Sequence, residues 1–242
     1  LEALSLTGVG AGTMLANGNH ARFENTLGAL RNVAGSNSWA GNVSLGGDAT
    51  DLTAAGLHDG FPVLTSNTAF FHVVTGGRLQ MTGAIANNID VVKRGGGELE
   101  YAGVLANTYD AATWILEGTL LANKEPGVNA VINRVDLGTN AAGAPAATLK
   151  LGGSDQMRDD RGVRVFASGV FDLQGNSEVL AGNFELMIGP TNAADVVIGS
   201  GGVLTPNVNT TIFTVGTANP SGVTISGGAF ALQVFGTIAT AG

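Results

Sequence analysis

The densest group of ionisable side chains lies in residues 155–164, with the sequence DQMRDDRGVR. It holds carboxylates and guanidinium groups in equal number, on Asp155, Asp159, Asp160, Arg158, Arg161 and Arg164. Paired carboxylates beside a basic residue serve as general acid, general base or charge stabiliser in reactions on sugars. These groups are contiguous and mixed in sign, whereas a groove on a repeating fold collects its carboxylates at intervals of about 20 residues. The pattern therefore favours a solvated loop that compensates its own charge, with a carbohydrate or ion site as the alternative.

Histidine and cysteine give no support for a metal or a nucleophile. No two of His20, His58 and His72 have the short spacing of a metal motif. We expect His20 and His58 in solvated turns, and His72 on a strand with one face in water. The absence of Cys excludes thiolate metal sites, cysteine nucleophiles and disulfides. We therefore expect no catalytic residue, no metal and no cofactor.

Aromatic and asparagine side chains are the remaining candidates for ligand contact. Sugar faces stack on aromatic rings, so the aromatics of interest for carbohydrate are Trp39, Trp114, Tyr101 and Tyr109. For Trp114, packing in the interior is the favoured interpretation. Four asparagines are expected to form hydrogen bonds at corners of the chain, because Asn tolerates left-handed backbone angles and bonds its own backbone. They are Asn107, Asn123, Asn176 and Asn192.

The composition narrows the class of protein that holds these residues. Glycine accounts for 38 of 242 residues, more than twice the usual share of roughly 7%, and charged residues for 12%, about half the usual roughly 25%. A hydrophobic content of 44% suffices for a large core. The formal net charge of -8 argues against nucleic-acid binding, which needs clustered Lys and Arg. No apolar run approaches the roughly 20 residues of a membrane-spanning helix.

Short apolar or Thr-rich runs alternate with Gly, Asn or Asp along the whole chain. In Arg78 to Met81 and Glu98 to Tyr101, polar and apolar residues alternate with the period of a half-buried β-strand. Frequent Gly residues disfavour helices, at about 1 kcal/mol each relative to Ala. We therefore predict an all-β protein. Examples of the expected strands are Asn42 to Leu45, Phe70 to Val74, Arg78 to Thr82, Gly97 to Tyr101, Thr113 to Glu117, Thr119 to Ala122, Thr148 to Leu151, Val163 to Phe166, Val170 to Leu173, Phe184 to Ile188, Asp195 to Ile198, Gly222 to Ile225 and Ala229 to Phe235.

A repeated phrase favours a solenoid over a sandwich or a barrel. Asn17-Gly18 and Asp59-Gly60 are the only dipeptides of the kind that closes tight hairpins, which disfavours the other two architectures. Gly-Gly-X-Leu ends at Leu79, recurs with its end at Leu99, and returns in looser form with its end at Leu120. An interval of about 20 residues suits one coil of short strands and corners. We predict a single continuous domain over residues 1–242, a parallel β-helix of about ten or eleven coils and about 50 Å long.

Residues 91–124, VVKRGGGELEYAGVLANTYDAATWILEGTLLANK, closely resemble the autotransporter-associated β-strand repeat. The matching parts are Lys93, Gly95 to Tyr101, Ala102-Gly103, Asn107-Thr108-Tyr109 and Gly118-Thr119-Leu120. One departure is Asp110-Ala111, which stands where that family usually has Thr-Gly. Asn25 to Asp51 and Val170 to Ala181 look like companion segments. The resemblance implies a right-handed β-helix of the passenger type, secreted or displayed on the surface of bacteria with two membranes.

A structural role is the function that we expect. A solenoid exposes unpaired backbone groups at each end unless the end is capped, and no cap is recognisable at Leu1 or Gly242. We therefore expect a piece of a longer chain, or copies that stack head to tail into an extracellular fibre. The expected partners are further copies of the chain or adjoining repeats, with surface glycans as a further class. An adhesin stalk and a polysaccharide-active β-helix enzyme are the alternatives.

Overall fold

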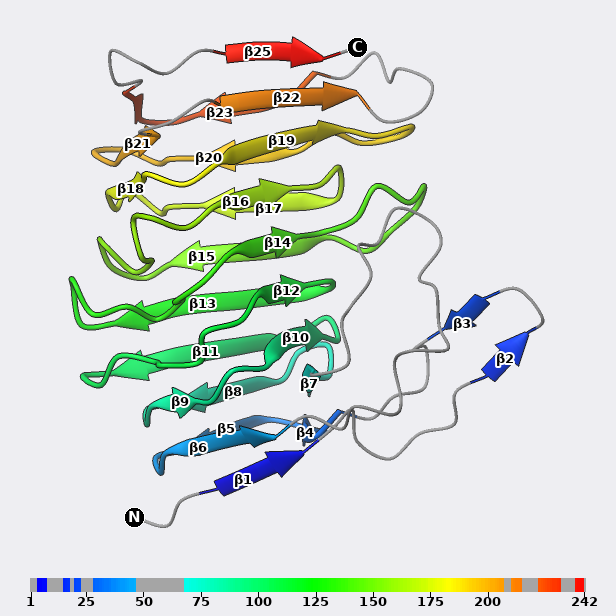
Figure 1. Ribbon diagram of the computed structural model, residues 1–242, viewed down its shortest axis with the longest axis vertical. Helices are drawn as coiled ribbons and strands as arrows, with labels where there is room; N and C mark the ends of the chain where they lie inside the picture. Colours follow the sequence, from blue (N-terminus) through cyan, green and yellow to red (C-terminus); the bar gives the residue numbers. More distant parts are fainter. Residues whose placement is uncertain are drawn as a thin grey trace.

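The computed structural model describes residues 4–7, 15–17, 20–22, 28–46, 68–206, 210–214, 222–231 and 238–241, and within these ranges it contains strands and no helix. The strands stack along one direction, with β1 (Leu4–Thr7) and β25 (Ile238–Ala241) at opposite ends (Figure 1). The all-β prediction is confirmed, and the long parallel sheets are compatible with a β-solenoid. Within the described part of the chain, no helical segment has the length and apolar character needed to cross a bilayer.

Sheet I contains nine strands, and each pairs in parallel with the next. In spatial order they are β4 (Leu30–Asn32), β7 (Thr68–Val73), β10 (Asp90–Arg94), β12 (Thr113–Ile115), β14 (Val135–Leu137), β16 (Val163–Val165), β19 (Phe184–Ile188), β22 (Thr210–Thr214) and β25. Val91 pairs with Thr113, and Thr113 pairs with Val135, so the chain completes one lap between each residue and its partner. Because parallel neighbours require such a crossover, the chain leaves the sheet after each strand and returns one strand further along.

Sheet II contains eight strands, also parallel. In spatial order they are β5 (Ser36–Trp39), β8 (Arg78–Met81), β11 (Glu98–Gly103), β13 (Gly118–Lys124), β15 (Ala147–Leu151), β17 (Gly169–Asp172), β20 (Asp195–Val197) and β23 (Thr224–Ser226). Leu79, Leu99 and Leu120 pair in register on β8, β11 and β13. The repeated leucine phrase of the sequence therefore marks equivalent positions in successive laps.

Two smaller parallel sheets and one hairpin complete the described strands. Sheet III is β1, β6 (Val43–Gly46) and β9 (Ile85–Ala86), and sheet IV is β18 (Glu178–Leu180), β21 (Val203–Pro206) and β24 (Ala229–Phe230). The hairpin is β2 (Leu15–Asn17) with β3 (His20–Arg22), in which Asn17 pairs with His20. It is the one antiparallel pair among the strands that the structure describes.

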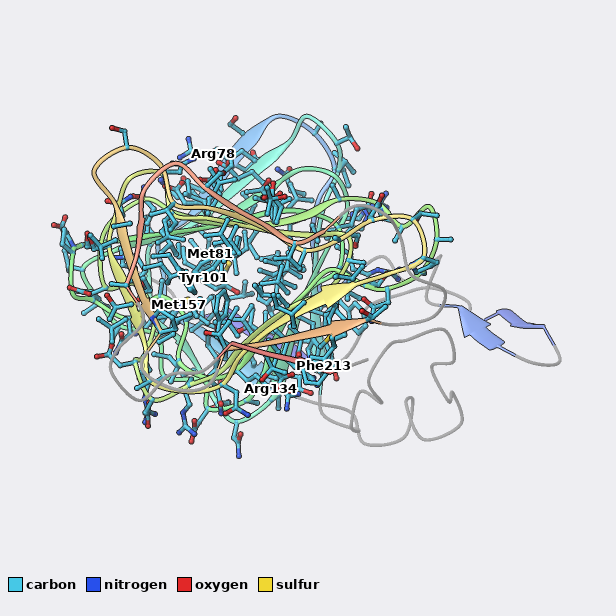
Figure 2. The ribbon with its side chains drawn as sticks, turned by 90° about the horizontal axis from the view of Figure 1, so that it is seen from above. Arg78, Met81, Tyr101, Arg134, Met157 and Phe213 are labelled. Carbon is cyan, nitrogen blue, oxygen red and sulfur yellow. The ribbon has the colours of Figure 1, made fainter. Side chains whose placement is uncertain are left out.

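The core lies between the inner faces of the sheets. Leu79, Leu99, Leu120 and Leu149 form one inner row of sheet II, and all are buried. Comparable rows of Val, Ile, Leu and Phe line sheet I. Seen along the stack, Met81, Tyr101 and Met157 lie inside, whereas Arg78 and Arg134 lie on opposite outer faces (Figure 2). Alternation along each strand therefore places one set of side chains in the core and the other outside.

The predicted strands agree well with those observed. Each of the thirteen predicted segments overlaps a strand, although part of Ala229 to Phe235 lies outside the described residues. Several strands of sheet I, including β10, β14 and β22, are not among the segments that the sequence interpretation named. It also placed His20 in a turn, whereas His20 begins β3 and pairs with Asn17 of β2.

Candidate functional site

A row of residues follows the outer face of sheet I. Trp114, Asp136, Arg164 and Glu185 occupy paired positions on β12, β14, β16 and β19. Their neighbours along each strand, such as Val135, belong to the core, so strand alternation turns this row outward. The fold thereby aligns residues that lie a whole lap apart in the sequence.

Asp136 is the centre of this row. Its fully buried carboxylate accepts hydrogen bonds from Nε of Arg134 at 2.8 Å and from Nε of Arg164 at 2.5 Å. The guanidinium of Arg134 lies over the ring of Trp114, and that of Arg164 over the ring of Phe166, each 5.5 Å from the ring centre. Charge-assisted hydrogen bonds and these ring contacts together hold both arginines in fixed orientations.

The charged stretch at residues 155–164 compensates its own charge only in part. Arg158 donates two hydrogen bonds to Asp160, at 3.0 and 2.8 Å, which lower the pKa of the Asp160 carboxyl. Arg161 lies 3.7 Å from Asp160 and 3.7 Å from Asp110 of an earlier lap. Arg164 reaches the buried carboxylate of β14. The predicted loop is thus confirmed for Arg158 and Asp160, whereas the other two arginines join it to other laps.

A pocket of about 460 Å³ opens beside these side chains, and we name it the arginine pocket. Its charged and amide lining consists of Asn133, Arg134, Asp160, Arg161, Arg164, Asn183 and Glu185. These residues come from three successive laps, those of β14, β16 and β19. The Nε atom of Arg161 is buried and has no hydrogen-bond partner among the described residues. Buried donors are rarely left in this state.

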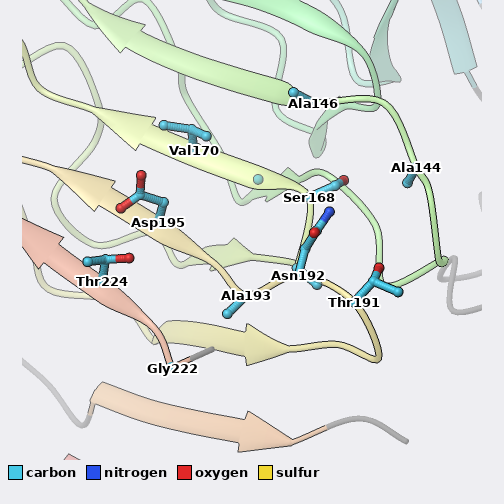
Figure 3. A pocket seen from close by; sticks show the side chains of 12 residues that line it. Ala144, Ala146, Ser168, Val170, Thr191, Asn192, Ala193, Asp195, Gly222 and Thr224 are labelled. Atoms are coloured by element: carbon cyan, nitrogen blue, oxygen red, sulfur yellow. The ribbon is translucent and has the colours of Figure 1, made fainter. Parts of the chain in front are cut away.

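A second pocket, of about 360 Å³, lies at the edge of sheet II (Figure 3), and we name it the corner pocket. Ala146, Val170, Asp195 and Thr224 line it from successive laps, together with a loop that includes Asn192. Among the described residues that line it, only Asp195 is charged. The corner pocket is therefore lined mainly by small neutral side chains.

Lys93 of β10 occupies an interior row, beside Phe71 of β7, and is completely buried. Its Nζ donates to the carbonyl oxygens of Arg94, Gly95 and Glu117, at 2.9, 2.5 and 3.0 Å. Burial lowers the pKa of the Lys93 ammonium to about 7, against the opposing charge of Glu117. A neutral amine has only two hydrogens, so the ammonium form alone satisfies all three carbonyls. Lys93 thereby ties together the corners of two laps.

Gln156 and Glu178 form a second buried polar group. The side-chain oxygen of Gln156 accepts a hydrogen bond from the backbone N–H of Lys124 at 2.8 Å. The backbone N–H of Gln156 donates to Oε2 of Glu178 at 2.9 Å. The other carboxyl oxygen of Glu178 is buried without a partner among the described residues. Burial raises the pKa of Glu178 to about 8 and lowers the pKa of Lys124, whose Nζ donates to Ala102, to about 8. Lys124, Gln156 and Glu178 thus form side-chain hydrogen bonds with backbone groups of neighbouring laps, and none of them lines either pocket.

The predicted corner hydrogen bonds are confirmed for Asn107 and Asn176, whereas Asn123 lies within β13. The Asn107 side chain accepts from the backbone of the lap before it at 3.0 Å and donates to the lap after it at 2.7 Å. Asn176 donates to a backbone carbonyl of an earlier lap at 2.8 Å, and Asn123 to a carboxylate at 2.7 Å. Asn192 instead lines the corner pocket.

The aromatic residues mostly pack in the interior. Tyr101 and Tyr109 are fully buried with ring centres 6.5 Å apart, and burial raises the pKa of both phenols. Trp114 is 3% exposed, so it is buried as predicted, but it packs on the outer side of sheet I and not in the interior. Trp39 is half-buried. None of the four lines either pocket.

The described residues contain no cluster of His, Cys, Asp or Glu that could hold a metal ion. His72 lies on β7 and is half-buried, as expected, and burial lowers its pKa. His58 lies outside the described residues.

Sequence reasoning did not find Asp136 or Arg134. Asp136 stands between two buried aliphatic residues of a three-residue strand, which is a weak signal for an outward carboxylate. The lap from Asp136 to its partner Arg164 is longer than the lap from Trp114 to Asp136, so a fixed period does not align the two. Alternation along β14 and β16 was the only available signal.

No family model matches the chain, and no curated protein or solved structure is significantly similar to it. The resemblance of residues 91–124 to autotransporter-associated repeats therefore stays a prediction. The features of the chain that bear on its function are the pairing of its laps and the lining of its two pockets.

Proposed function

We propose that the chain is a structural β-solenoid, a right-handed parallel β-helix of about ten or eleven coils, that contributes to an extracellular or cell-surface fibre. The observation that carries this proposal is the continuous parallel pairing of sheets I and II, in which each strand bonds only to the strands one lap before and after it. Such an arrangement extends in one dimension and leaves its last strands able to pair further.

The polar interior supports a mechanical role. Lys93, Asn107 and Gln156 use their side chains to bond backbone groups of adjacent laps. Such bonds lock the laps in register and leave few buried backbone groups without partners. The proposal thus assigns the buried polar chemistry to holding the stack together.

The edges of the stack support assembly. Among the described residues, β25 has a neighbour in sheet I only on the side of β22, and β4 only on the side of β7. A parallel strand from a second copy, or from adjoining repeats of the same chain, fits each of these edges. Placement outside the cell rests on the resemblance of residues 91–124 to passenger repeats.

Electron microscopy of the purified chain tests the fibre. We expect filaments with a subunit repeat of about 50 Å, since neighbouring laps are about 4.8 Å apart. Lysines on an edge strand oppose pairing with another chain, so the double variant Ala239→Lys and Ala241→Lys on β25 should remain monomeric.

The matched control adds the same charge away from the edges, with Thr108→Lys and Ala142→Lys at exposed positions between strands of middle laps. It should form filaments as the parent chain does. A parent chain that stays monomeric over a wide range of concentrations, or an edge variant that still polymerises, would refute the fibre. An adhesin stalk is the second candidate, and the arginine pocket is the observation that favours it.

A further inference from the structure

The arginine pocket has the construction of a ligand site and not of a simple surface ion pair. Its volume of about 460 Å³ falls within the roughly 300–1,000 Å³ of typical small-molecule sites. Its polar side chains come from three successive laps. A groove site on a repeating fold is expected to have this arrangement, which the contiguous stretch at residues 155–164 does not provide by itself. The fold therefore brings charged residues of this stretch together with polar residues of the laps before and after it in the lining of one pocket.

Two of its arginines are oriented but only partly used. Arg134 and Arg164 each donate Nε to Asp136, and neither has a further hydrogen-bond partner for its terminal Nη nitrogens among the described residues. Their side chains are 45% and 25% exposed. A guanidinium fixed through Nε still presents Nη donors in a planar fork, the geometry that suits a carboxylate.

The third arginine has an unmet hydrogen bond. Nε of Arg161 is buried, and the nearest carboxylate oxygen, on Asp160, is 3.7 Å away, too far for a hydrogen bond. Leaving a buried donor without a partner is unfavourable. The side chain of Arg161 is 33% exposed, and its terminal Nη2 lies 3.7 Å from Asp110, so the exposed end of the guanidinium can donate to a bound molecule.

The rest of the lining determines the class of ligand. Asp160 and Glu185 supply carboxylate acceptors, and Asn183 supplies an amide. These carboxylates would repel a nucleic acid or another dense polyanion, as would the net charge of -8. A molecule that carries one carboxylate together with several hydroxyl groups matches both the guanidinium donors and the carboxylate acceptors.

We propose that the arginine pocket binds a carboxylated sugar, with the sugar carboxylate at Arg134 and Arg164 and its hydroxyl groups at Asp160, Arg161, Asn183 and Glu185. Because the site is on the outer side of sheet I, such a sugar has access to it while the laps stay intact. The site gives the solenoid a ligand of its own, independent of whether the chain forms fibres.

Isothermal titration calorimetry with galacturonate, and with its methyl ester as the uncharged counterpart, tests this assignment. We expect binding of the acid and at least tenfold weaker binding of the ester. Arg161→Gln should weaken binding of the acid about tenfold, because it removes a guanidinium donor from the pocket lining. The buried Nε of Arg161 has no hydrogen-bond partner to lose among the described residues. Arg164→Lys keeps a positive charge near Asp136 but removes the planar fork, and should weaken binding similarly.

Arg31→Gln is the matched control, because it removes one positive charge at an exposed position on β4 and should leave the affinity unchanged. Thermal unfolding verifies that each variant is folded, and if Arg164→Lys is not, Arg161→Gln decides alone. Equal affinity for acid and ester, unchanged affinity in Arg161→Gln, or no binding of either sugar would overturn the proposal. Competition by sulfate at equal concentration would also overturn it, because the pocket would then be a general anion site.

Discussion

At the scale of single residues, buried polar side chains act as replacements for backbone hydrogen bonds. The corners between strands leave carbonyl and N–H groups that no strand partner satisfies, and Lys93, Asn107 and Gln156 bond to such groups. Each has a pattern of donors and acceptors that an apolar residue cannot provide. The interior of the stack therefore consists of rows of aliphatic side chains, with side-chain hydrogen bonds to backbone groups at the corners.

Glu178 makes a prediction about pH, because its folded-state pKa of about 8 lies above the usual 4.5. Burial is the main cause, and the nearby charges of Asp155 and Asp159 add to it. The folded chain then binds more protons than the unfolded chain between these two values, so this contribution to stability is complete below about pH 4.5 and is lost as the pH rises through about 8. Its size is on the order of a few kcal/mol.

Urea unfolding at pH 5, 6 and 7 measures this effect. The free energy of unfolding of the parent chain should fall over this range, and Glu178→Gln should reduce the slope because glutamine does not titrate. Glu125→Gln, at an exposed position, should keep the slope of the parent chain. Equal slopes for the parent and Glu178→Gln would show that the carboxyl is not the source. Lys93 and Lys124, with lowered pKa values of about 7 and about 8, work in the opposite direction at higher pH.

At the scale of elements, glycines set how closely successive laps approach. A Cβ atom on Gly97 would lie 2.2 Å from the carbonyl oxygen of Val74 and 2.6 Å from that of Gly77, both of them backbone atoms of the preceding lap. Backbone cannot move aside without opening the ladder between β8 and β11. Gly97→Ala should therefore lower the free energy of unfolding by about 2–4 kcal/mol.

Alanine substitutions at two other glycines distinguish the effect of steric crowding from that of backbone strain. Gly76→Ala adds a Cβ with no atom within 4 Å but at a φ of 77°, so only the left-handed conformation opposes it, at about 1–2 kcal/mol. Gly222→Ala meets neither obstacle and should change stability by less than about 0.5 kcal/mol. Chemical denaturation of the three variants should give this order, and a Gly97→Ala as stable as Gly222→Ala would contradict the close approach of the laps.

The same elements show what the sequence could predict. The strands of sheet II were predictable because Gly-Gly-X-Leu recurs at nearly equal intervals and places Leu79, Leu99 and Leu120 in register. Strand β10 was missed because its interior position holds Lys93, which no polarity pattern would place in a core. The arginine pocket was missed because the laps that bring its side chains together differ in length, and such unequal intervals leave no periodic signal.

At the scale of the whole molecule, the stack behaves as a one-dimensional array. Each strand inside sheets I and II pairs with the lap before and the lap after, and the end strands pair with one lap, so stability is approximately the sum of lap terms and of interfaces between neighbours. The middle laps have two such interfaces and dry inner faces, as in β15, where every second residue is buried. Strands β23 and β24 contain no buried residue. Stability is therefore expected to decrease from the middle toward the C-terminal laps.

Native-state hydrogen exchange resolves this gradient strand by strand. Amides of β12, β13 and β15 should exchange by the largest opening and those of β23 and β24 by local fraying, with protection factors that differ by at least about a hundredfold. If the chain forms filaments, its C-terminal laps gain a second interface, and their exchange in the filament should slow toward that of the middle laps, whereas the middle laps should change little. Uniform protection across all strands in the monomer would contradict the array and would mean that the laps unfold as one cooperative unit. Protection of β23 and β24 that is the same in monomer and filament would exclude pairing at that end.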